Sequence, residues 1–190
     1  MDEDEFRIFC DFIEAPNSDE SIPPSRIEID ESEMIQKLEV NIEPIDLKLF
    51  EKEELVGKGS FGKVYKVVDI RTNEKYAAKV SILDLTICDK YLFKNLSNEI
   101  NILSKLNAHS ILKFFGYNSN DFKDKPKPTI ITEFARNGSL YFAIEQERKG
   151  LSIDGWNNTK KLINIFGVAY GMSYLLSLNI LHRDLKLANI

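Results

Sequence analysis

Three glycines and a lysine stand where a chain could approach a phosphate group and neutralise its charge. The segment Leu55-Val-Gly-Lys-Gly-Ser-Phe-Gly-Lys-Val64 reads G-x-G-x-x-G from Gly57 to Gly62. Because glycine lacks a Cβ, such a backbone can come close to phosphate oxygens. Lys79 follows among apolar neighbours, where an ammonium is costly to bury without an anion. The pattern indicates phosphate binding, although a tight hairpin without a ligand carries the same glycines.

The residues after Gly62 distinguish this segment from two other glycine-rich loops. A dinucleotide-binding loop opens a helix, whereas Lys63-Val-Tyr-Lys-Val-Val-Asp-Ile70 is rich in β-branched residues and predicts a strand. A Walker A loop needs Ser or Thr after its lysine, and Val64 has no hydroxyl to hold magnesium. The sequence therefore predicts a strand, a glycine turn and a second strand. A further strand is predicted over 75–80, after the polar turn Arg71-Thr-Asn-Glu74.

A carboxylate accompanies the next predicted element. Apolar residues recur at three- and four-residue spacing over 91–106, which predicts an amphipathic helix. Glu99 lies beside the apolar stripe of this helix, where a carboxylate needs a cation. We expect Lys79 to be that cation, and the alternative is that the two side chains lie separately on the surface.

The last ten residues, Leu181-His-Arg-Asp-Leu-Lys-Leu-Ala-Asn-Ile190, match the pattern H-R-D-L-x-x-x-N. With the glycine loop and Lys79 upstream, the chain resembles a protein kinase from about Ile45 to its last residue. The resemblance implies an α+β fold of two lobes. An antiparallel β-sheet with one helix would form the N-lobe over 45–132. A hinge would follow at 133–137, and the first helices of an incomplete α-helical C-lobe over 138–190.

The resemblance also implies that ATP and Mg²⁺ are cofactors and that the other substrate is a protein. Glycines of the loop would cover the phosphates, Lys79 held by Glu99 would contact the α- and β-phosphates, and Thr132 would be the gatekeeper. The residues expected to bind the nucleotide are Val56, Gly57, Lys58, Gly59, Ser60, Phe61, Gly62, Val64, Ala77, Lys79, Thr132, Glu133 and Ala135.

Three residues of the final segment would perform the transfer. Asp184 would orient the substrate hydroxyl and accept its proton, Lys186 would neutralise the γ-phosphate, and Asn189 would bind one magnesium ion. Lys186, two places after Asp184, is typical of serine/threonine and tyrosine-kinase-like enzymes rather than of true tyrosine kinases. The sequence of the expected hinge, Thr129-Ile-Ile-Thr-Glu-Phe-Ala135, also resembles that of the tyrosine-kinase-like group. We therefore expect transfer of phosphate to Ser or Thr in signal transduction.

The Asp-Phe-Gly motif, whose aspartate holds the main magnesium ion in this family, does not occur in the 190 residues. This leaves a second hypothesis for the chain taken alone. It could be a truncated, catalytically inactive fragment that binds nucleotide weakly or acts by protein interaction. The 162–178 segment would then expose apolar surface that the missing part of a C-lobe would otherwise cover.

The charge is unevenly distributed. Residues 1–40 hold 13 acidic and 3 basic residues, a net of −10, and residues 41–190 hold 17 acidic and 22 basic residues, a net of +5. Together with several prolines, this composition predicts a poorly ordered acidic leader over 1–44. A docking arm for a basic partner is the alternative. The rest of the chain lacks a concentrated basic run with stacking aromatics, so we expect no nucleic-acid partner.

Cys10 and Cys88 lack the spacing of a metal site, and the acidic N-terminus lacks the positive charge of a signal peptide. Both observations favour a cytoplasmic location. The segment Leu162–Leu181 carries no charge and is long enough to span a membrane, as a membrane-anchored acidic adaptor would require. Its recurring Asn and Ser residues favour a buried helix of a soluble domain, without a membrane partner. The oligomeric state is left open.

Overall fold

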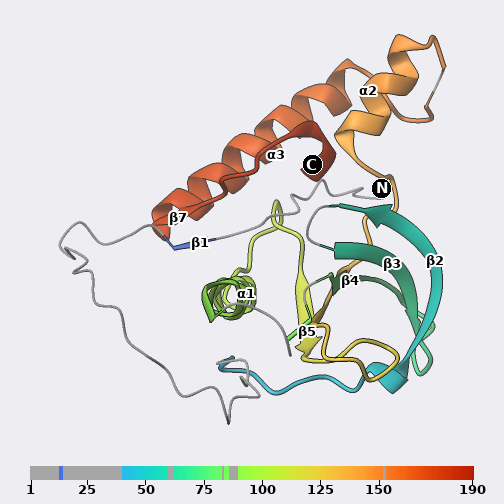
Figure 1. Ribbon diagram of the computed structural model, residues 1–190. Coiled ribbons are helices and arrows are strands. Elements are labelled where there is room, and N and C mark those ends of the chain that lie inside the picture. The colour runs from blue at the N-terminus through green and yellow to red at the C-terminus, as the bar shows by residue number, and fades with distance from the viewer. Residues whose placement is uncertain (1–12, 15–39, 60–61, 83, 86–89, 152) are drawn as a thin grey trace, which may run out of the picture.

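The computed structural model describes residues 13–14, 40–59, 62–82, 84–85, 90–151 and 153–190. In this part of the chain an antiparallel five-stranded sheet and three α-helices form the α+β fold that the sequence predicted (Figure 1). The elements are β1 (Ile13–Glu14), η1 (Leu47–Leu49), β2 (Phe50–Lys58), β3 (Gly62–Asp69), β4 (Lys75–Ser81), α1 (Lys90–Leu103), β5 (Phe114–Asn118), β6 (Thr129–Glu133), α2 (Leu140–Arg148), α3 (Asn158–Ser177), β7 (Ile180–Leu181) and η2 (Leu187–Asn189).

The five-stranded sheet has the order β2-β3-β4-β6-β5, with every neighbouring pair antiparallel. Its first three strands follow one another in sequence, as the glycine turn and the polar turn predicted. The strands lie within one residue of the predicted ranges 63–70 and 75–80. Val67, Ala78 and Ile131 are fully buried in one core cluster on this sheet, beside Leu47 of η1.

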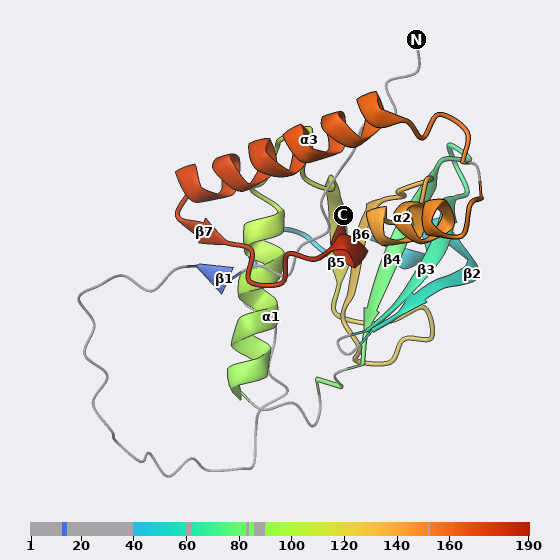
Figure 2. The same ribbon diagram turned by 90° about the horizontal axis from the view of Figure 1, so that it is seen from above.

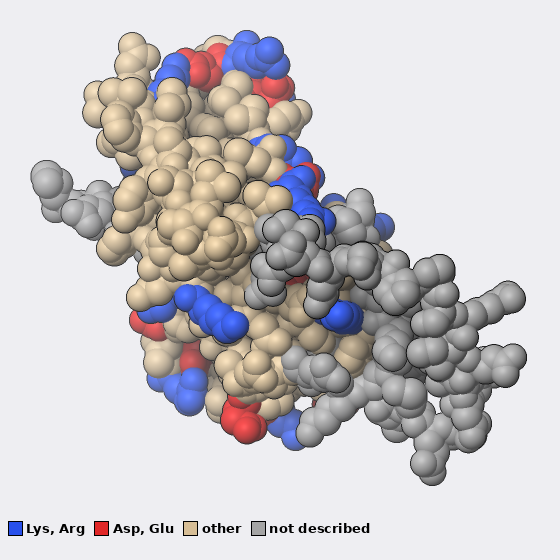
Figure 3. Space-filling model, turned by 90° about the vertical axis from the view of Figure 1, so that its left-hand side faces the viewer, with Lys and Arg blue, Asp and Glu red and all other residues tan. Residues whose placement is uncertain are grey.

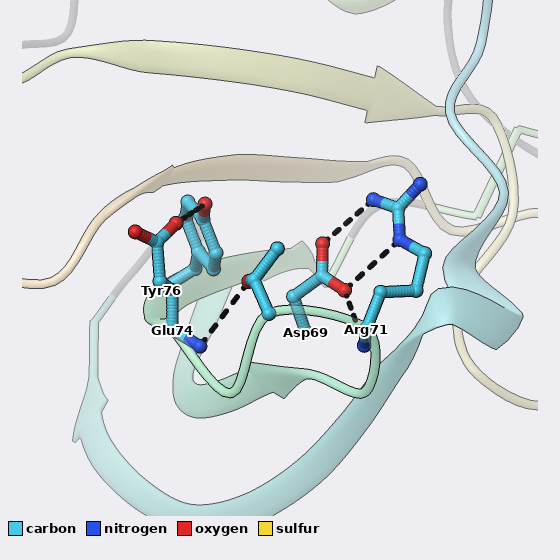
Figure 4. Close-up of polar contacts among 5 residues, drawn as sticks. Asp69, Arg71, Glu74 and Tyr76 are labelled. Carbon is cyan, nitrogen blue, oxygen red and sulfur yellow. Dashed lines mark hydrogen bonds and ion pairs between the residues drawn. The ribbon is translucent and has the colours of Figure 1, made fainter.

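A network of polar contacts closes the turn between β3 and β4 (Figure 4). The buried carboxylate of Asp69 accepts hydrogen bonds from the main-chain N–H of Arg71 at 2.8 Å and from its guanidinium at 2.6 and 3.0 Å. The Arg71 side chain thereby lowers the pKa of Asp69 to about 2. Tyr76 donates its hydroxyl to Glu74 at 2.8 Å, and this bond raises the pKa of Tyr76 to about 12. The turn aligns β4, which carries Lys79.

Helix α1 packs in the larger core cluster, between the sheet and the C-terminal part of the chain. The cluster combines residues of α1 such as Ile100 with Tyr117 of β5, Ile130 of β6 and Leu175 of α3. Ile100 and Leu175 have no exposed surface. The apolar stripe that predicted the helix therefore faces this core, and the helix ends at Leu103, three residues before the predicted end.

Helices α2 and α3 begin at side-chain caps that the sequence supplies. Ser139 accepts a hydrogen bond from the N–H of Phe142 at 3.3 Å, and Asn157 accepts one from the N–H of Lys160 at 2.9 Å. Asn179, which ends the α3 segment, has φ +58°, the left-handed conformation common after a helix.

The helix predicted within Leu162–Leu181 is present as α3, but it is exposed for most of its length, as expected for the 162–178 segment of the chain taken alone and not as expected for a buried helix. In α3 only Asn164, Gly171 and Leu175 are buried, whereas Phe166 and Tyr170 are 69% and 63% exposed. The reason is that α3 contacts the rest of the described chain along one face only. Figure 3 shows the resulting surface over α3, on which charged side chains are nearly absent. Within the described residues no helix meets the length and apolarity that a membrane crossing needs.

The segment 1–44 was predicted to be a poorly ordered leader, and the structure differs from this at two places. Residues 1–12 and 15–39 lie outside the described residues, as do Cys10 and Cys88. Strand β1 pairs antiparallel with β7 in a separate two-stranded sheet, Ile13 opposite Leu181 and Glu14 opposite Ile180. Val40 and Ile42 pack against the cluster around α1. In Figure 2, β1 lies between α1 and β7.

Candidate nucleotide and phosphoryl-transfer site

The ends of β2 and β3 that flank the glycine segment lie close together. The N–H of Gly59 donates to the carbonyl of Gly62 at 2.9 Å, and Lys58 pairs with Lys63 across the two strands. A Cβ at Gly62 would lie 2.7 Å from the carbonyl oxygen of Val80, so this position requires glycine. The predicted strand–turn–strand unit is therefore present. Ser60 and Phe61, which the sequence assigned to the nucleotide site, lie outside the described residues.

The register of the sheet places the predicted nucleotide-binding residues on one face. Val64 of β3 pairs with Lys79 of β4, and Ala77 of β4 pairs with Thr132 of β6. Residues directly opposite each other share a face, and residues two apart on a strand also share one. Val64, Ala77, Lys79 and Thr132 thus belong to the face toward α1. Val56 of β2 is 53% exposed, so its apolar surface is accessible to a ligand.

Lys79 and Glu99 form the ion pair that the sequence predicted. The Nζ atom of Lys79 lies 3.0 Å from Oε1 of Glu99, and the two side chains are only 13% and 16% exposed. Their partial burial distinguishes this pair from an ordinary surface contact. Lys79 comes from the centre of the sheet and Glu99 from α1, so the pair also joins these two elements.

The segment after β6 carries the predicted hinge. The N–H of Glu133 donates to the carbonyl of Lys113 at 2.9 Å, and the Glu133 carboxylate accepts from the N–H of Lys113 at 2.6 Å. The Glu133 carbonyl receives the hydroxyl of the buried Thr132 at 3.2 Å and, with two lone pairs, can accept a second bond. Ala135 is exposed. The edge of the hinge can therefore meet a flat polar ring.

The H-R-D segment forms a tight turn after β7. Arg183 has φ +56°, and the N–H of Asp184 donates to the carbonyl of His182 at 2.7 Å and toward its Nδ1 at 3.3 Å. No role was predicted for His182, which is only 1% exposed. Its place two residues before Asp184 in the motif was the available signal. The buried ring lies beside the main-chain N–H of Asp184 in this turn.

Two predicted catalytic residues and the predicted metal ligand meet in this turn. Lys186 Nζ lies 2.6 Å from Oδ2 of Asp184, and the Asn189 amide nitrogen donates to the Asp184 carbonyl at 2.8 Å and to Oδ2 at 3.0 Å. The Lys186 hydrogen bond, followed by that from Asn189, lowers the pKa of Asp184, so this carboxylate is ionised at neutral pH. The N–H of Leu140, the first residue of α2, donates to the carbonyl of Ile190 at 2.6 Å and ties the turn to that helix.

The two sets of residues suit different parts of a magnesium–nucleotide complex. Because Asn189 uses its nitrogen in both bonds to Asp184, its side-chain oxygen is the atom suited to a hard cation. The close backbone approach at Gly62 and the partly buried ammonium of Lys79 suit phosphate oxygens. These features fit ATP and Mg²⁺.

Comparisons with known proteins agree with this arrangement. The family model for the protein kinase domain matches residues 50–190. The human serine/threonine-protein kinase TNNI3K is 34% identical over 148 residues, which are 77% of this chain and 16% of that protein. Myosin light chain kinase A of Dictyostelium discoideum is 32% identical over 144 residues, 75% of this chain and 44% of that protein.

The chain therefore spans less than half the length of either relative. The region matched by the family model nonetheless covers well over half of the chain and contains both sets of site residues, which is enough to assign the family. The chain belongs to the protein kinase family.

Proposed function

We propose that the protein containing these 190 residues is an ATP-dependent kinase that transfers the γ-phosphate of ATP to Ser or Thr of protein substrates. The observation that carries the proposal is the Lys79–Glu99 pair on the same sheet face as Val64, Ala77 and Thr132. A positive charge fixed beside an apolar surface suits the phosphates and the base of one nucleotide. The similarity to the serine/threonine-protein kinase TNNI3K and the position of Lys186 support the choice of acceptor.

In this proposal the chain's residues bind and orient rather than react covalently. The glycine turn and Lys79 hold the phosphates, the main chain of Glu133 to Ala135 holds the adenine edge, and Val56 with Ala77 covers the ring. Asp184 orients the acceptor hydroxyl and receives its proton. When bound, Mg²⁺ supplies positive charge to the phosphate oxygens, and Asn189 is the residue proposed to hold it.

The depressed pKa of Asp184 fits an orienting role. A carboxylate that is ionised at neutral pH can accept a hydrogen bond from a Ser or Thr hydroxyl, and its geometry then matters more than its basicity. Lys186, which now contacts Asp184 at 2.6 Å, can also reach toward a phosphate because its ammonium is compact and its stem is flexible. The chemistry is therefore positioning and charge stabilisation.

The exposed apolar side chains of α3, such as Phe166 and Tyr170, favour a second candidate function for the 190 residues taken alone. They would then act as a catalytically inactive fragment that binds nucleotide weakly or acts by protein interaction. We propose further that the protein acts in signal transduction, and that it does so in the cytoplasm, which the two cysteines without disulfide or metal-site spacing favour.

The test compares the 190-residue chain with the protein encoded by the longest open reading frame that contains it. We would measure Mg-ATP affinity and phosphate transfer to matched Ser, Thr and Tyr peptides. The longer protein should label Ser or Thr, and Asp184→Asn should lower its rate about 10²- to 10⁴-fold with little change in Mg-ATP affinity. Labelling of tyrosine alone would make the Lys186 interpretation wrong. Absence of Mg-ATP binding in both proteins would contradict the nucleotide site.

A further inference from the structure

Residues that precede the kinase-matching region contact the helix that carries Glu99. The match begins at residue 50, yet Val40 and Ile42 pack against the core cluster around α1. The N–H of Asn41 donates to the side-chain oxygen of Asn101, on α1, at 3.0 Å. This stretch is fastened at its other end too, because the N–H of Ile45 donates to the carbonyl of Tyr117 at 2.8 Å.

The same N-terminal segment reaches α1 at a second place. Strand β1 contacts α1 and pairs with β7, which leads directly into the turn that holds Asp184. Figures 1 and 2 both place β1 beside β7 and near α1. We call β1 and residues 40–45 together the N-terminal clamp. The clamp thus contacts α1 from two stretches of chain that residues 15–39 connect.

The position of Asn101 on α1 allows the clamp to resist rotation of this helix. Successive residues of an α-helix are about 100° apart, so Glu99 and Asn101 point to nearly opposite sides. Glu99 is bound to Lys79 on the sheet, and Asn101 is bound to the main chain of Asn41. Rotation of α1 about its axis that withdrew Glu99 from Lys79 would therefore also break the Asn41–Asn101 bond.

We propose that the N-terminal clamp positions Glu99, with Asn101 as the positioning residue, and so favours the nucleotide-binding arrangement of α1. The proposal rests on the nucleotide site proposed above. Asn101 touches no substrate in this account and acts only through the placement of Glu99. Loss of its hydrogen bond shifts α1 toward arrangements in which Lys79 is not held for the phosphates.

The first experiment measures Mg-ATP binding to the 190-residue chain by calorimetry. Asn101→Ala should weaken binding about threefold to tenfold, the range expected for one net hydrogen bond. Asn101→Asp keeps an oxygen acceptor for the Asn41 N–H and should restore affinity to within about twofold. Asn107→Ala is the matched control, because Asn107 is exposed and its bond to Tyr174 is made by the main-chain N–H.

A double-mutant cycle separates positioning from general destabilisation. If Asn101 acts through Glu99, then Asn101→Ala should change affinity by less than about 1.5-fold once Glu99→Gln is present. If Asn101→Ala lowered Mg-ATP affinity equally with and without Glu99→Gln, the proposal would be overturned. Unchanged Mg-ATP affinity in the Asn101→Ala chain would also overturn it.

Hydrogen exchange of α1 amides, measured without nucleotide, tests the clamp even if no Mg-ATP binds. Asn101→Ala should accelerate exchange in α1 and Asn101→Asp should not, and unchanged exchange overturns the proposal.

Proline substitutions in β1 test the other part of the clamp. In an antiparallel pair, opposite residues alternate between being joined by two main-chain hydrogen bonds and being joined by none. One of Ile13→Pro and Glu14→Pro should therefore accelerate exchange in α1 and β7, whereas the alanine variants at both positions should not. If wild-type chain binds no Mg-ATP but these shifts occur, the clamp stands and the proposed function fails.

Discussion

Lys79 Nζ lies 3.0 Å from Glu99 Oε1 although twenty residues separate them in the sequence. The pair joins the middle of the sheet to α1, and both side chains are mostly shielded from solvent. An ammonium in such a place needs anions, and here one carboxylate supplies part of the compensation. A bound triphosphate would add to it. In the function proposed above, this contact connects the packing of α1 with the affinity for nucleotide.

Lys79→Met should abolish measurable Mg-ATP binding, because methionine retains the length of the side chain but removes its charge. Lys75→Met is the matched control: Lys75 is exposed on the same strand, and its loss should leave affinity within about twofold. Calorimetric titration of both variants measures the difference. Unchanged affinity in Lys79→Met would refute the pocket as assigned.

Gly62→Ala should destabilise the protein by about 1–3 kcal/mol, because the new Cβ meets the Val80 carbonyl and a strand must move. Gly59→Ala, in the same turn, has no described atom within 4 Å of the added Cβ and should cost no more than about 0.5 kcal/mol. Urea unfolding of both variants gives the comparison. Equal losses at the two glycines would show that close packing at Gly62 is not the cause.

Asp69→Asn should flatten the acid dependence of stability. The pKa of Asp69 is lowered from 3.8 to about 2, so its ionised form stabilises the fold above about pH 4 and this contribution disappears as the pH falls toward 2. The stability difference between wild-type protein and Asp69→Asn should therefore disappear as the pH falls through that interval. Melting temperatures between pH 2 and 7 measure this, with the exposed Asp154→Asn as control. A constant gap across the interval would exclude Asp69 as the titrating group.

Glu147→Gln should alter the fluorescence of Trp156, the chain's single tryptophan. Glu147 accepts a hydrogen bond from Trp156 Nε1 at 3.0 Å and forms an ion pair with Lys161, which lowers the pKa of Glu147. Without the charge, both contacts weaken and the indole becomes more hydrated. Glu145→Gln, whose partner is Arg148 on the same helix, should leave the emission unchanged. Identical spectra for the wild-type chain and Glu147→Gln would contradict the contact.

Local patterns predicted most of the fold and the internal parts of the site. The β-branched runs predicted β3 and β4 because they mark strands directly, and the H-R-D-L-x-x-x-N spacing brought Asp184, Lys186 and Asn189 into one short turn. The Lys79–Glu99 pair could be expected because each charge needed a partner in an apolar setting. The roles of these residues remain proposals.

Contacts between distant segments could not be predicted. The composition of 1–44 resembles a solvated tail, and nothing local signals that the Asn41 N–H meets Asn101 or that β1 pairs with β7. The uncharged run in α3 allowed both a buried helix and an exposed apolar surface, because burial depends on the surfaces that face a helix, and the described chain covers one side of it. Hydrophobicity alone does not identify that partner surface.

In the proposed function the glycine turn, Lys79 and the Asp184 turn bind one nucleotide. Titration with ATP and Mn²⁺ in place of Mg²⁺ tests it directly, since the paramagnetic ion broadens NMR signals of nearby amides. Signals of Gly59, Gly62, Asp184 and Asn189 should broaden together, at one metal–nucleotide concentration, and Lys79→Met should remove the effect. Broadening confined to either turn, or persisting unchanged in Lys79→Met, would show that the two turns and Lys79 do not share one nucleotide.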